Sequence, residues 1–158
     1  MPGSEEMAMG AIAAGGFRYL NQALVQQLNL SPQVIRATLQ REQQELARRE
    51  QVYRGDRPPL DLNRRTVILI DDGLATGATL QAAIAAVKAQ QPKTLVVAVP
   101  VAAKDTCQQI GATVDRIVCG ETPQPFRAVG LWYEDFPQTT DREVQWLLNR
   151  QAQAIAAS

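Results

Sequence analysis

The chain contains no histidine. It therefore cannot form the Ser-His-Asp or Cys-His arrangements that activate a nucleophile, or the histidine-containing zinc sites of common hydrolases. Cysteine is scarce as well, because only Cys107 and Cys119 are present and their spacing matches no CxxC pattern. We expect neither a zinc site nor a disulfide framework, and we interpret both cysteines as small core residues.

An excess of charge of one sign is also absent. Lys and Arg together number 16, Asp and Glu together number 16, and the formal net charge is zero. No basic run is available to follow a nucleic-acid backbone or an anionic membrane, so we expect neither partner. The sequence has no apolar run of about 18 residues and no signal-peptide pattern at its start. We expect a soluble, cytoplasmic protein.

The 158 residues, 46% of them hydrophobic, suit a single domain with a hydrophobic core. Apolar runs at 8–14 and 17–20, separated by a glycine pair, predict a β-hairpin. Ser31 followed by Pro32 predicts the start of one long helix, because serine caps helices and proline suits the first turn. We interpret the arginines in its second half as a solvated face rather than a basic binding surface.

The second half of the chain alternates between strand and helix patterns. The continuous apolar runs TVILI (66–70) and TLVVAVPV (94–101) predict strands that are buried on both faces. Apolar positions at helical spacing from Leu80 to Val87 predict a helix between them, and hence a right-handed parallel crossover. A helix near 104–110, a strand near 116–119 and a C-terminal helix with apolar positions at Val144, Leu147, Leu148 and Ile155 continue the series. The predicted fold class is α/β, a mostly parallel sheet flanked by helices in a Rossmann-like core.

The stretch VILIDDGLATGAT, residues 67–79, carries the clearest functional pattern. Asp71 and Asp72 follow the predicted strand at the end where parallel sheets bind ligands. After them come glycines, threonines and a helix start with unpaired N–H groups, which together suit a phosphate. Two carboxylates beside a phosphate cradle can accept hydrogen bonds from the vicinal hydroxyls of a sugar 5-phosphate. The residues assigned to the cradle are Gly73, Ala75, Thr76, Gly77, Ala78 and Thr79.

Other loop motifs agree less well with this stretch. A Walker A loop needs a Gly-Lys-Ser/Thr ending, and a dinucleotide fingerprint needs three glycines at closer spacing, so neither motif is present. A plain strand-to-helix turn capped by Asp72 or Thr76 accounts for one acid or one threonine. It does not account for two acids, two glycines and two threonines together.

The stretch resembles the ribose-phosphate-binding signature of the type I phosphoribosyltransferases. The resemblance implies that Asp71 and Asp72 hold the ribose 2- and 3-hydroxyls of phosphoribosyl pyrophosphate, and that residues 75–79 wrap its 5-phosphate. It also implies Mg²⁺ bound through the diphosphate substrate rather than in a protein cage. The acids would further stabilise an oxocarbenium-like state when pyrophosphate leaves the anomeric carbon.

Two further segments extend the resemblance. YRGDRPPLDLNRR, residues 53–65, is similar in position to the mobile loop that closes over pyrophosphate in the family, with Arg54 and Arg57 as its phosphate ligands. A surface linker with solvated arginines is the alternative for this segment.

The other segment, ETPQPFRAVGLWYEDF at residues 121–136, resembles the one that holds the base in purine-using members. Phe126 would stack on the base, and Glu134 or Asp135 could approach the magnesium and pyrophosphate. The alternative is that aromatic and aliphatic residues of this segment simply pack the end of the sheet. Those residues are Phe126, Leu131, Trp132 and Tyr133.

The chain departs from the family at its start. Family members open with a helix and a strand that lead to a short glycine-containing loop for pyrophosphate, whereas Met1 falls at a later segment. We expect either a fragment or a shortened form, with apolar strand surface left uncovered and a marginal or self-associating chain.

Two functions remain open at this point. The first is a glycosyltransferase of nucleotide metabolism that moves a phosphoribosyl group to a nitrogenous acceptor, such as a nucleobase. The second is a non-catalytic regulator that binds phosphoribosyl pyrophosphate or a nucleotide 5-monophosphate. A phosphohydrolase is a weaker third reading, because it needs a carboxylate nucleophile with a metal cluster.

Overall fold

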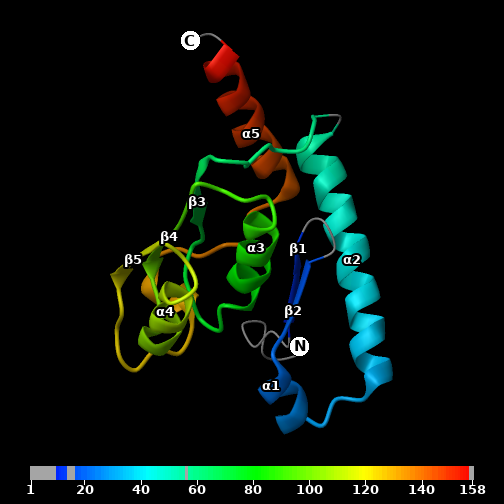
Figure 1. Ribbon diagram of the computed structural model, residues 1–158, viewed down its shortest axis with the longest axis vertical. Helices are drawn as coiled ribbons and strands as arrows, with labels where there is room; N and C mark the ends of the chain where they lie inside the picture. Colours follow the sequence, from blue (N-terminus) through cyan, green and yellow to red (C-terminus); the bar gives the residue numbers. More distant parts are fainter. Residues whose placement is uncertain (1–9, 14–16, 56, 157–158) are drawn as a thin grey trace.

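A computed structural model describes residues 10–13, 17–55 and 57–156 of the chain. Figure 1 shows the elements in chain order: β1 (Gly10–Ala13), β2 (Phe17–Leu20), α1 (Gln22–Gln27), α2 (Pro32–Arg54), β3 (Thr66–Ile70), α3 (Ala78–Lys88), β4 (Thr94–Val101), α4 (Lys104–Gly111), β5 (Arg116–Glu121), the 3-10 helix η2 (Val129–Trp132) and α5 (Asp141–Ala156). The predicted alternation of strands and helices is confirmed.

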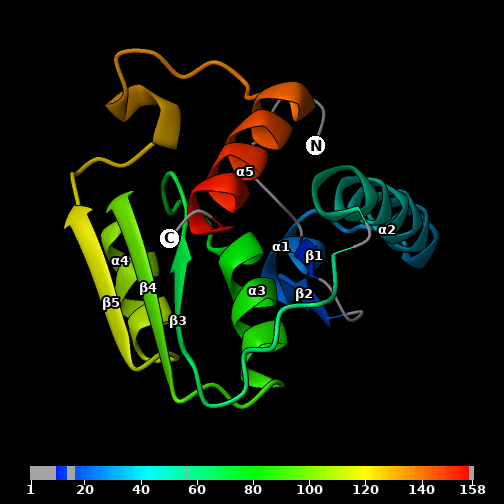
Figure 2. The same ribbon diagram turned by 90° about the horizontal axis from the view of Figure 1, so that it is seen from above.

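The central sheet has three parallel strands in the order β3-β4-β5. Figure 2 shows the strands side by side with α4 behind them. Helices α3 and α4 pack on the same face of the sheet, where their apolar side chains join those of β4. The core residues are Leu74, Leu80, Ile84, Val87, Leu95, Val97, Val99, Ala102 and Ile110. The α/β class with a parallel sheet is therefore confirmed.

The other face of the sheet is open, and here the prediction of strands buried on both faces is wrong for β3. Ile68 is 57% exposed and Ile70 is 77% exposed, while Val118 on β5 is 43% exposed. Both helices that follow these strands cover the opposite face, so the alternate residues of β3 face outward.

The N-terminal part of the described chain packs around α3. Strands β1 and β2 pair antiparallel as predicted, and both contact α3. The glycine pair expected at their turn lies outside the described residues. At the start of α2, the Ser31 side chain accepts a hydrogen bond from the Val34 N–H at 3.3 Å, and Pro32 occupies the first turn, which confirms the predicted cap. No residue of α2 is buried, in agreement with a solvated helix.

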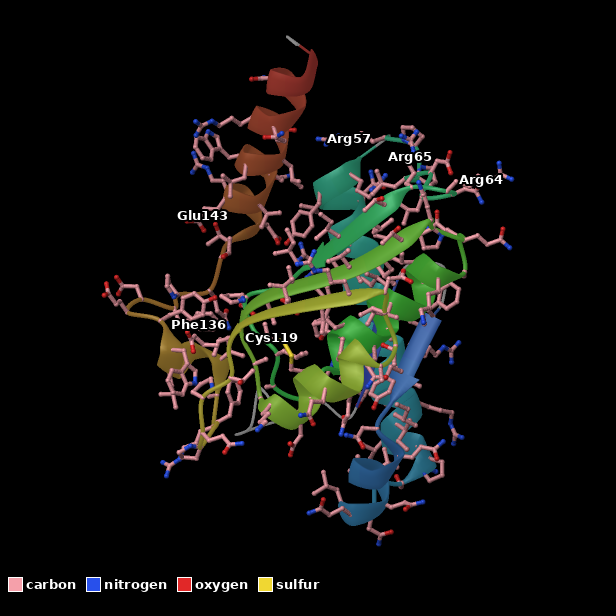
Figure 3. All side chains as sticks on the ribbon, turned by 60° about the vertical axis from the view of Figure 1, so that its left-hand side comes forward. Arg57, Arg64, Arg65, Cys119, Phe136 and Glu143 are labelled. Atoms are coloured by element: carbon pink, nitrogen blue, oxygen red, sulfur yellow. A yellow bond between two sulfur atoms is a disulfide. The ribbon has the colours of Figure 1, made fainter. Side chains whose placement is uncertain are left out.

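Cys107 and Cys119 form a disulfide that joins α4 to β5. Figure 3 shows the sulfur bond at Cys119. The expectation of no disulfide is therefore wrong, although both residues pack against the hydrophobic core as expected. The physical reason is topological: α4 lies against β5, so residues with a sequence separation of 12 come together without any recognisable spacing motif.

Helix α5 contacts the C-terminal half of α2 through polar groups. Arg48 Nη1 lies 2.6 Å from Asp141 Oδ2, the Tyr53 hydroxyl also donates to Asp141, and Gln145 Nε2 donates to the Val52 carbonyl at 2.9 Å. The apolar positions predicted to close the fold are less buried than expected, since Leu147 is 53% exposed. None of the helices in the described ranges combines the length and apolar content needed to cross a membrane.

Candidate functional site

The acidic loop lies between the carboxyl end of β3 and the start of α3, as its sequence predicts. Leu74 anchors the middle of this loop and is 1% exposed. Its N–H donates to the Val101 carbonyl at 2.9 Å, and its own carbonyl accepts from the Ala103 N–H at 2.8 Å. These bonds form a parallel bridge between Leu74 and Ala102 that continues the β3–β4 pairing. The loop is therefore fixed on both sides of Leu74.

Asp71 and Asp72 lie on the β3 side of this anchor. Asp71 is half-buried and Asp72 is exposed, and the Asp72 N–H donates to Asp71 Oδ1 at 3.1 Å. Burial raises the pKa of Asp71, the charge of Asp72 raises it further, and the Asp72 N–H opposes both effects. A ligand that brings hydroxyl donors would compensate the lost hydration of this carboxylate.

The other side of Leu74 leads into α3. Gly77 has a φ of 74° at the N-cap position, and no side chain caps the helix. The first-turn N–H groups of such a helix lack helical partners and attract anions. Thr76 and Thr79 are exposed, while Gly77 and Ala78 are buried and offer only backbone groups. Residues 75–79 thus form a helix start with the exposed threonines Thr76 and Thr79 beside it, and phosphate binding by these residues stays a prediction.

Thr106 on α4 supports this half of the loop, and sequence reasoning missed it. Its hydroxyl donates to the Ala75 carbonyl at 2.7 Å. A Cβ added to Gly77 would lie 3.0 Å from Thr106 Cγ2 and 3.5 Å from Ile110 Cδ1. Gly77 is therefore required by its backbone conformation and by packing against α4. No local pattern signals this contact, because α4 follows much later in the chain.

The C-terminal segment covers the acidic half of the loop. The Tyr133 hydroxyl donates to the Asp72 carbonyl at 2.6 Å. A Cβ on Gly73 would overlap the Val129 side chain, with Cγ2 only 2.7 Å away, so the glycine allows η2 to approach. Tyr133 and Val129 were not predicted as site residues. The only signal for them is the aromatic density of the segment 121–136.

Phe126, the predicted base-stacking residue, is half-buried and stacks on Trp132 with ring centroids 6.5 Å apart. The alternative, that this segment packs the end of the sheet, is wrong for two residues. Leu131 is 69% exposed and Trp132 is 47% exposed. Glu134 and Asp135 are also exposed, so their approach to a metal-bound diphosphate stays a prediction.

The structure does not bring Arg54 and Arg57 to the acidic pair. Arg54 donates to the Pro58 carbonyl, and Arg57 Nη2 donates to Asn149 Oδ1 at 2.9 Å. In Figure 3, Arg57 and Arg65 lie toward one end of the sheet and Phe136 lies toward the other. Both arginines line a cavity of about 860 Å³ near the C-terminal end of α3. Their predicted contact with pyrophosphate would need a different arrangement of residues 53–65.

The described part of the chain holds no group of three or more His, Cys, Asp or Glu side chains arranged around a metal site. The two carboxylates of the acidic loop are oxygen ligands of the kind that magnesium uses, but two residues do not make a cage. The donor set fits a magnesium ion that keeps most of its ligands from substrate and water.

Residues 4–131 match the model of the phosphoribosyl transferase domain family, so the chain belongs to that family. The resemblance to the type I phosphoribosyltransferases is thereby confirmed.

Individual relatives agree with this assignment. Rv0571c and MT0597 of two Mycobacterium tuberculosis strains, H37Rv and CDC 1551, are provisionally named as phosphoribosyl transferases. Each is 37% identical over 150 residues, which is 95% of this chain and 34% of the relative. The chain therefore spans about a third of the length of these curated relatives. The crystal structure of TT1426 from Thermus thermophilus superposes with a TM-score of 0.70 at 34% identity, covering 90% of this chain and 67% of that one.

Proposed function

We propose that the protein binds phosphoribosyl pyrophosphate and transfers its phosphoribosyl group to a nitrogenous acceptor, with release of pyrophosphate. One observation carries the proposal: in a chain of this family, a single anchored loop places two carboxylates on one side of Leu74 and an uncapped helix start on the other. That spacing suits the diol and the 5-phosphate of one ribose.

Each part of the loop has a role in this reaction. Asp71 and Asp72 accept hydrogen bonds from the ribose hydroxyls and orient the ring, while the backbone N–H groups at the start of α3 and the Thr76 and Thr79 hydroxyls bind the 5-phosphate. The anomeric C–O bond to pyrophosphate breaks as the acceptor nitrogen bonds to that carbon. The acids stabilise the positive charge that develops on the ring. Bound Mg²⁺ would neutralise charge on the departing diphosphate.

The acceptor would lie on the side of the C-terminal segment. Phe126 is half-buried in a stack with Trp132, and Tyr133 fixes this segment to the acidic loop. A planar nitrogenous base is the acceptor that an aromatic surface of this kind favours. We therefore assign Phe126 to base stacking within the same proposal.

A second function is favoured by one specific observation. The arginines that would hold pyrophosphate bond to Pro58 and Asn149 and line a cavity to which the acidic pair does not contribute, so the described residues do not assemble a diphosphate site around that pair. A regulator that binds phosphoribosyl pyrophosphate or a nucleotide 5-monophosphate needs the ribose-phosphate half alone. The two functions differ in whether pyrophosphate is released.

The deciding experiment is the exchange of labelled pyrophosphate into phosphoribosyl pyrophosphate, with magnesium and a panel of bases. Calorimetric titration with ribose 5-phosphate and with phosphoribosyl pyrophosphate runs in parallel. Exchange that depends on one base supports the transferase, and binding without exchange supports the regulator. If neither ligand binds, the ribose-phosphate assignment is wrong.

The loop assignment has its own control. The double substitution Asp71→Asn with Asp72→Asn removes two charge-assisted hydrogen bonds, each worth about 1.5–3 kcal/mol, and should weaken ribose 5-phosphate binding by that order while the fold survives. Glu42→Gln, an exposed acid on α2 outside both ligand segments, is the control and should bind as the unmodified chain does. Equal affinity in a folded double variant would remove the diol-binding role.

A further inference from the structure

Asp72 is held by hydrogen bonds to its backbone on both sides. Its N–H donates to Asp71 Oδ1 at 3.1 Å, and its carbonyl accepts a hydrogen bond from the Tyr133 hydroxyl at 2.6 Å. The residue is exposed, and its carboxylate joins none of the ion pairs among the described residues. The backbone of Asp72 is therefore fixed while its carboxylate is left to a ligand.

The bond from Tyr133 matters because a glycine follows Asp72. Gly73 lacks a side chain, which is what allows Val129 to approach so closely. Glycine also rotates more freely about its backbone bonds than other residues, so the peptide between Asp72 and Gly73 could turn easily. A trans peptide is planar, and its C=O and N–H point in opposite directions. One hydrogen bond to the Asp72 carbonyl therefore fixes the orientation of the whole peptide.

Tyr133 is itself positioned by its neighbours in the C-terminal segment, residues 121–136. Its ring centroid lies 5.1 Å from that of Phe136, and its N–H donates to the Gly130 carbonyl at 3.4 Å. A Cβ on Gly130 would lie 2.8 Å from Phe136 Cδ1, so this glycine lets Phe136 pack closely against η2. The Tyr133 hydroxyl thus reaches the acidic loop from a folded turn and not from a free side chain.

The same turn carries the aromatic pair assigned to the acceptor. Trp132 precedes Tyr133 and stacks on Phe126, with ring centroids 6.5 Å apart. Tyr133 therefore connects this aromatic surface directly to Asp72. All of these contacts join residues between 71 and 136, which belong to one continuously described range.

We propose that Tyr133 is a positioning residue that couples the acceptor side of the site to its ribose side. Its hydrogen bond holds Asp72 where the carboxylate can accept from a ribose hydroxyl, so the affinity for the sugar depends on the order of the C-terminal segment. Coupling of this kind is reciprocal, and a bound ribose-phosphate therefore orders the C-terminal segment in turn. The inference rests on the proposed function, because the diol contact of Asp72 is assigned there.

Tyr133→Phe tests the inference, because it removes the hydroxyl that donates to Asp72 and keeps the ring that packs against Phe136. We expect ribose 5-phosphate to bind about three- to tenfold more weakly, which is the size of effect that the loss of one hydrogen bond has. Inorganic phosphate, which has no sugar, should bind equally well with and without the hydroxyl. Tyr19→Phe on β2 is the matched control and should bind ribose 5-phosphate as the unmodified chain does.

Titration followed through backbone amide shifts measures both ligands even where binding is weak. If Tyr133→Phe keeps its full affinity for ribose 5-phosphate, or loses affinity for both ligands equally, Tyr133 does not position Asp72 and the inference alone is wrong. If the unmodified chain binds ribose 5-phosphate no better than inorganic phosphate, the diol assignment of the proposed function is wrong and the inference falls with it.

The reciprocal effect is measured at Trp132. The chain has two tryptophans, and Trp146→Phe leaves Trp132 as the only one. In that background ribose 5-phosphate should change the Trp132 fluorescence, and most of the change at saturation should disappear when Tyr133→Phe is added. A change of the same size with and without the Tyr133 hydroxyl overturns the coupling. So does an unchanged signal when titration shows that the ligand has bound.

Discussion

The sheet with its two helices and the pair formed by α2 and α5 are held together by different interactions. On the sheet, Leu95, Val97 and Ile110 are at most 1% exposed and pack into one core. Between α2 and α5, the contact of Arg48 with Asp141 joins side chains that are 46% and 42% exposed. Buried apolar area dominates stability, whereas exposed ion pairs contribute little. The acidic loop therefore belongs to the more stable region. Local opening of α5 should leave the acidic loop in place.

A leucine-to-alanine substitution made in each of the two regions should give the largest difference in the free energy of unfolding. Leu95→Ala removes buried methyl groups from the core and should lower the free energy of unfolding by about 2–5 kcal/mol. Leu147→Ala on α5, where the side chain is 53% exposed, should change it by much less. Urea denaturation measures both. Similar losses at the two positions would show that α5 is packed against a surface that the described residues do not reveal.

The second prediction concerns Gly77, which links the loop to the core. Gly77→Ala should cost roughly 1–2 kcal/mol from its left-handed backbone alone, with a further loss from contact with Thr106. We therefore expect stability and ribose-phosphate binding to fall together.

A double-mutant cycle separates the two causes at Gly77. Thr106→Ser keeps the hydroxyl that bonds to Ala75 and removes the methyl group that the new Cβ would meet. In that background Gly77→Ala should cost only the backbone part. If the cost is the same in both backgrounds, packing against α4 is not what restricts Gly77.

Asp71 should lower the free energy of unfolding at neutral pH while it contributes to ligand binding, and Asp71→Asn tests both effects. Burial and the charge of Asp72 raise the pKa of Asp71 above its ordinary value of 3.8 in the folded protein. Folding therefore favours the protonated acid: its stabilising contribution is present below the unfolded pKa and is lost as pH rises through the folded pKa.

At neutral pH, Asp71→Asn should therefore be more stable than the unmodified chain, and the difference should disappear as the pH falls below about 3.8. Ribose 5-phosphate binding should weaken in the same variant. Thermal unfolding across this pH range and calorimetry test the two halves. Asp72→Asn, which removes only the second cause, should give a smaller gain, and a neutral-pH loss of stability in Asp71→Asn would contradict the account.

The smallest change in the free energy of unfolding is expected at the contact between α5 and α2. Asp141→Asn weakens the hydrogen bonds to Arg48 and Tyr53, so α5 should exchange its amides faster and be cleaved more readily, while global unfolding scarcely changes. Hydrogen bonds from Arg48 and then Tyr53 lower the pKa of Asp141, so its contribution is present above 3.8 and is lost as pH falls through the lowered folded pKa.

Glu42→Gln, an exposed acid on α2 without an ion pair in the described structure, is the matched control for Asp141→Asn. It should leave the exchange of α5 unchanged. High salt should reduce the difference between Asp141→Asn and the unmodified chain, because the contact is exposed. A difference that is independent of salt would indicate packing rather than charge.

Much of the fold follows from local sequence. The apolar runs of β3 and β4, the helical spacing between them and the cap at Ser31 are each encoded within a few residues, and all are confirmed. Burial of the second face of β3 could not be judged in this way, because it depends on which elements cover the sheet. The Cys107–Cys119 disulfide has the same origin, since the packing of α4 on β5 brings the residues together.

The same distinction between local sequence and long-range packing applies to the candidate site. Asp71, Asp72 and the start of α3 are placed by the strand that precedes them, so their position was predictable. Tyr133 reaches the Asp72 carbonyl across a sequence separation of 61, and the bond of Arg57 to Asn149 spans 92. Contacts of that range depend on the whole topology, which is why the sequence indicated neither of them.

The bridge at Leu74 lowers the entropy that the acidic loop would lose on binding a ligand. It divides what would be one long loop into two short arcs, and short arcs have fewer conformations to lose than a long one. The entropy of ordering the loop is thus lost when the chain folds and not when a ligand arrives. A ribose-phosphate that contacts both arcs would bind a surface that is already ordered. Substitutions on the two sides of Leu74 would then alter the sugar contact and the phosphate contact separately.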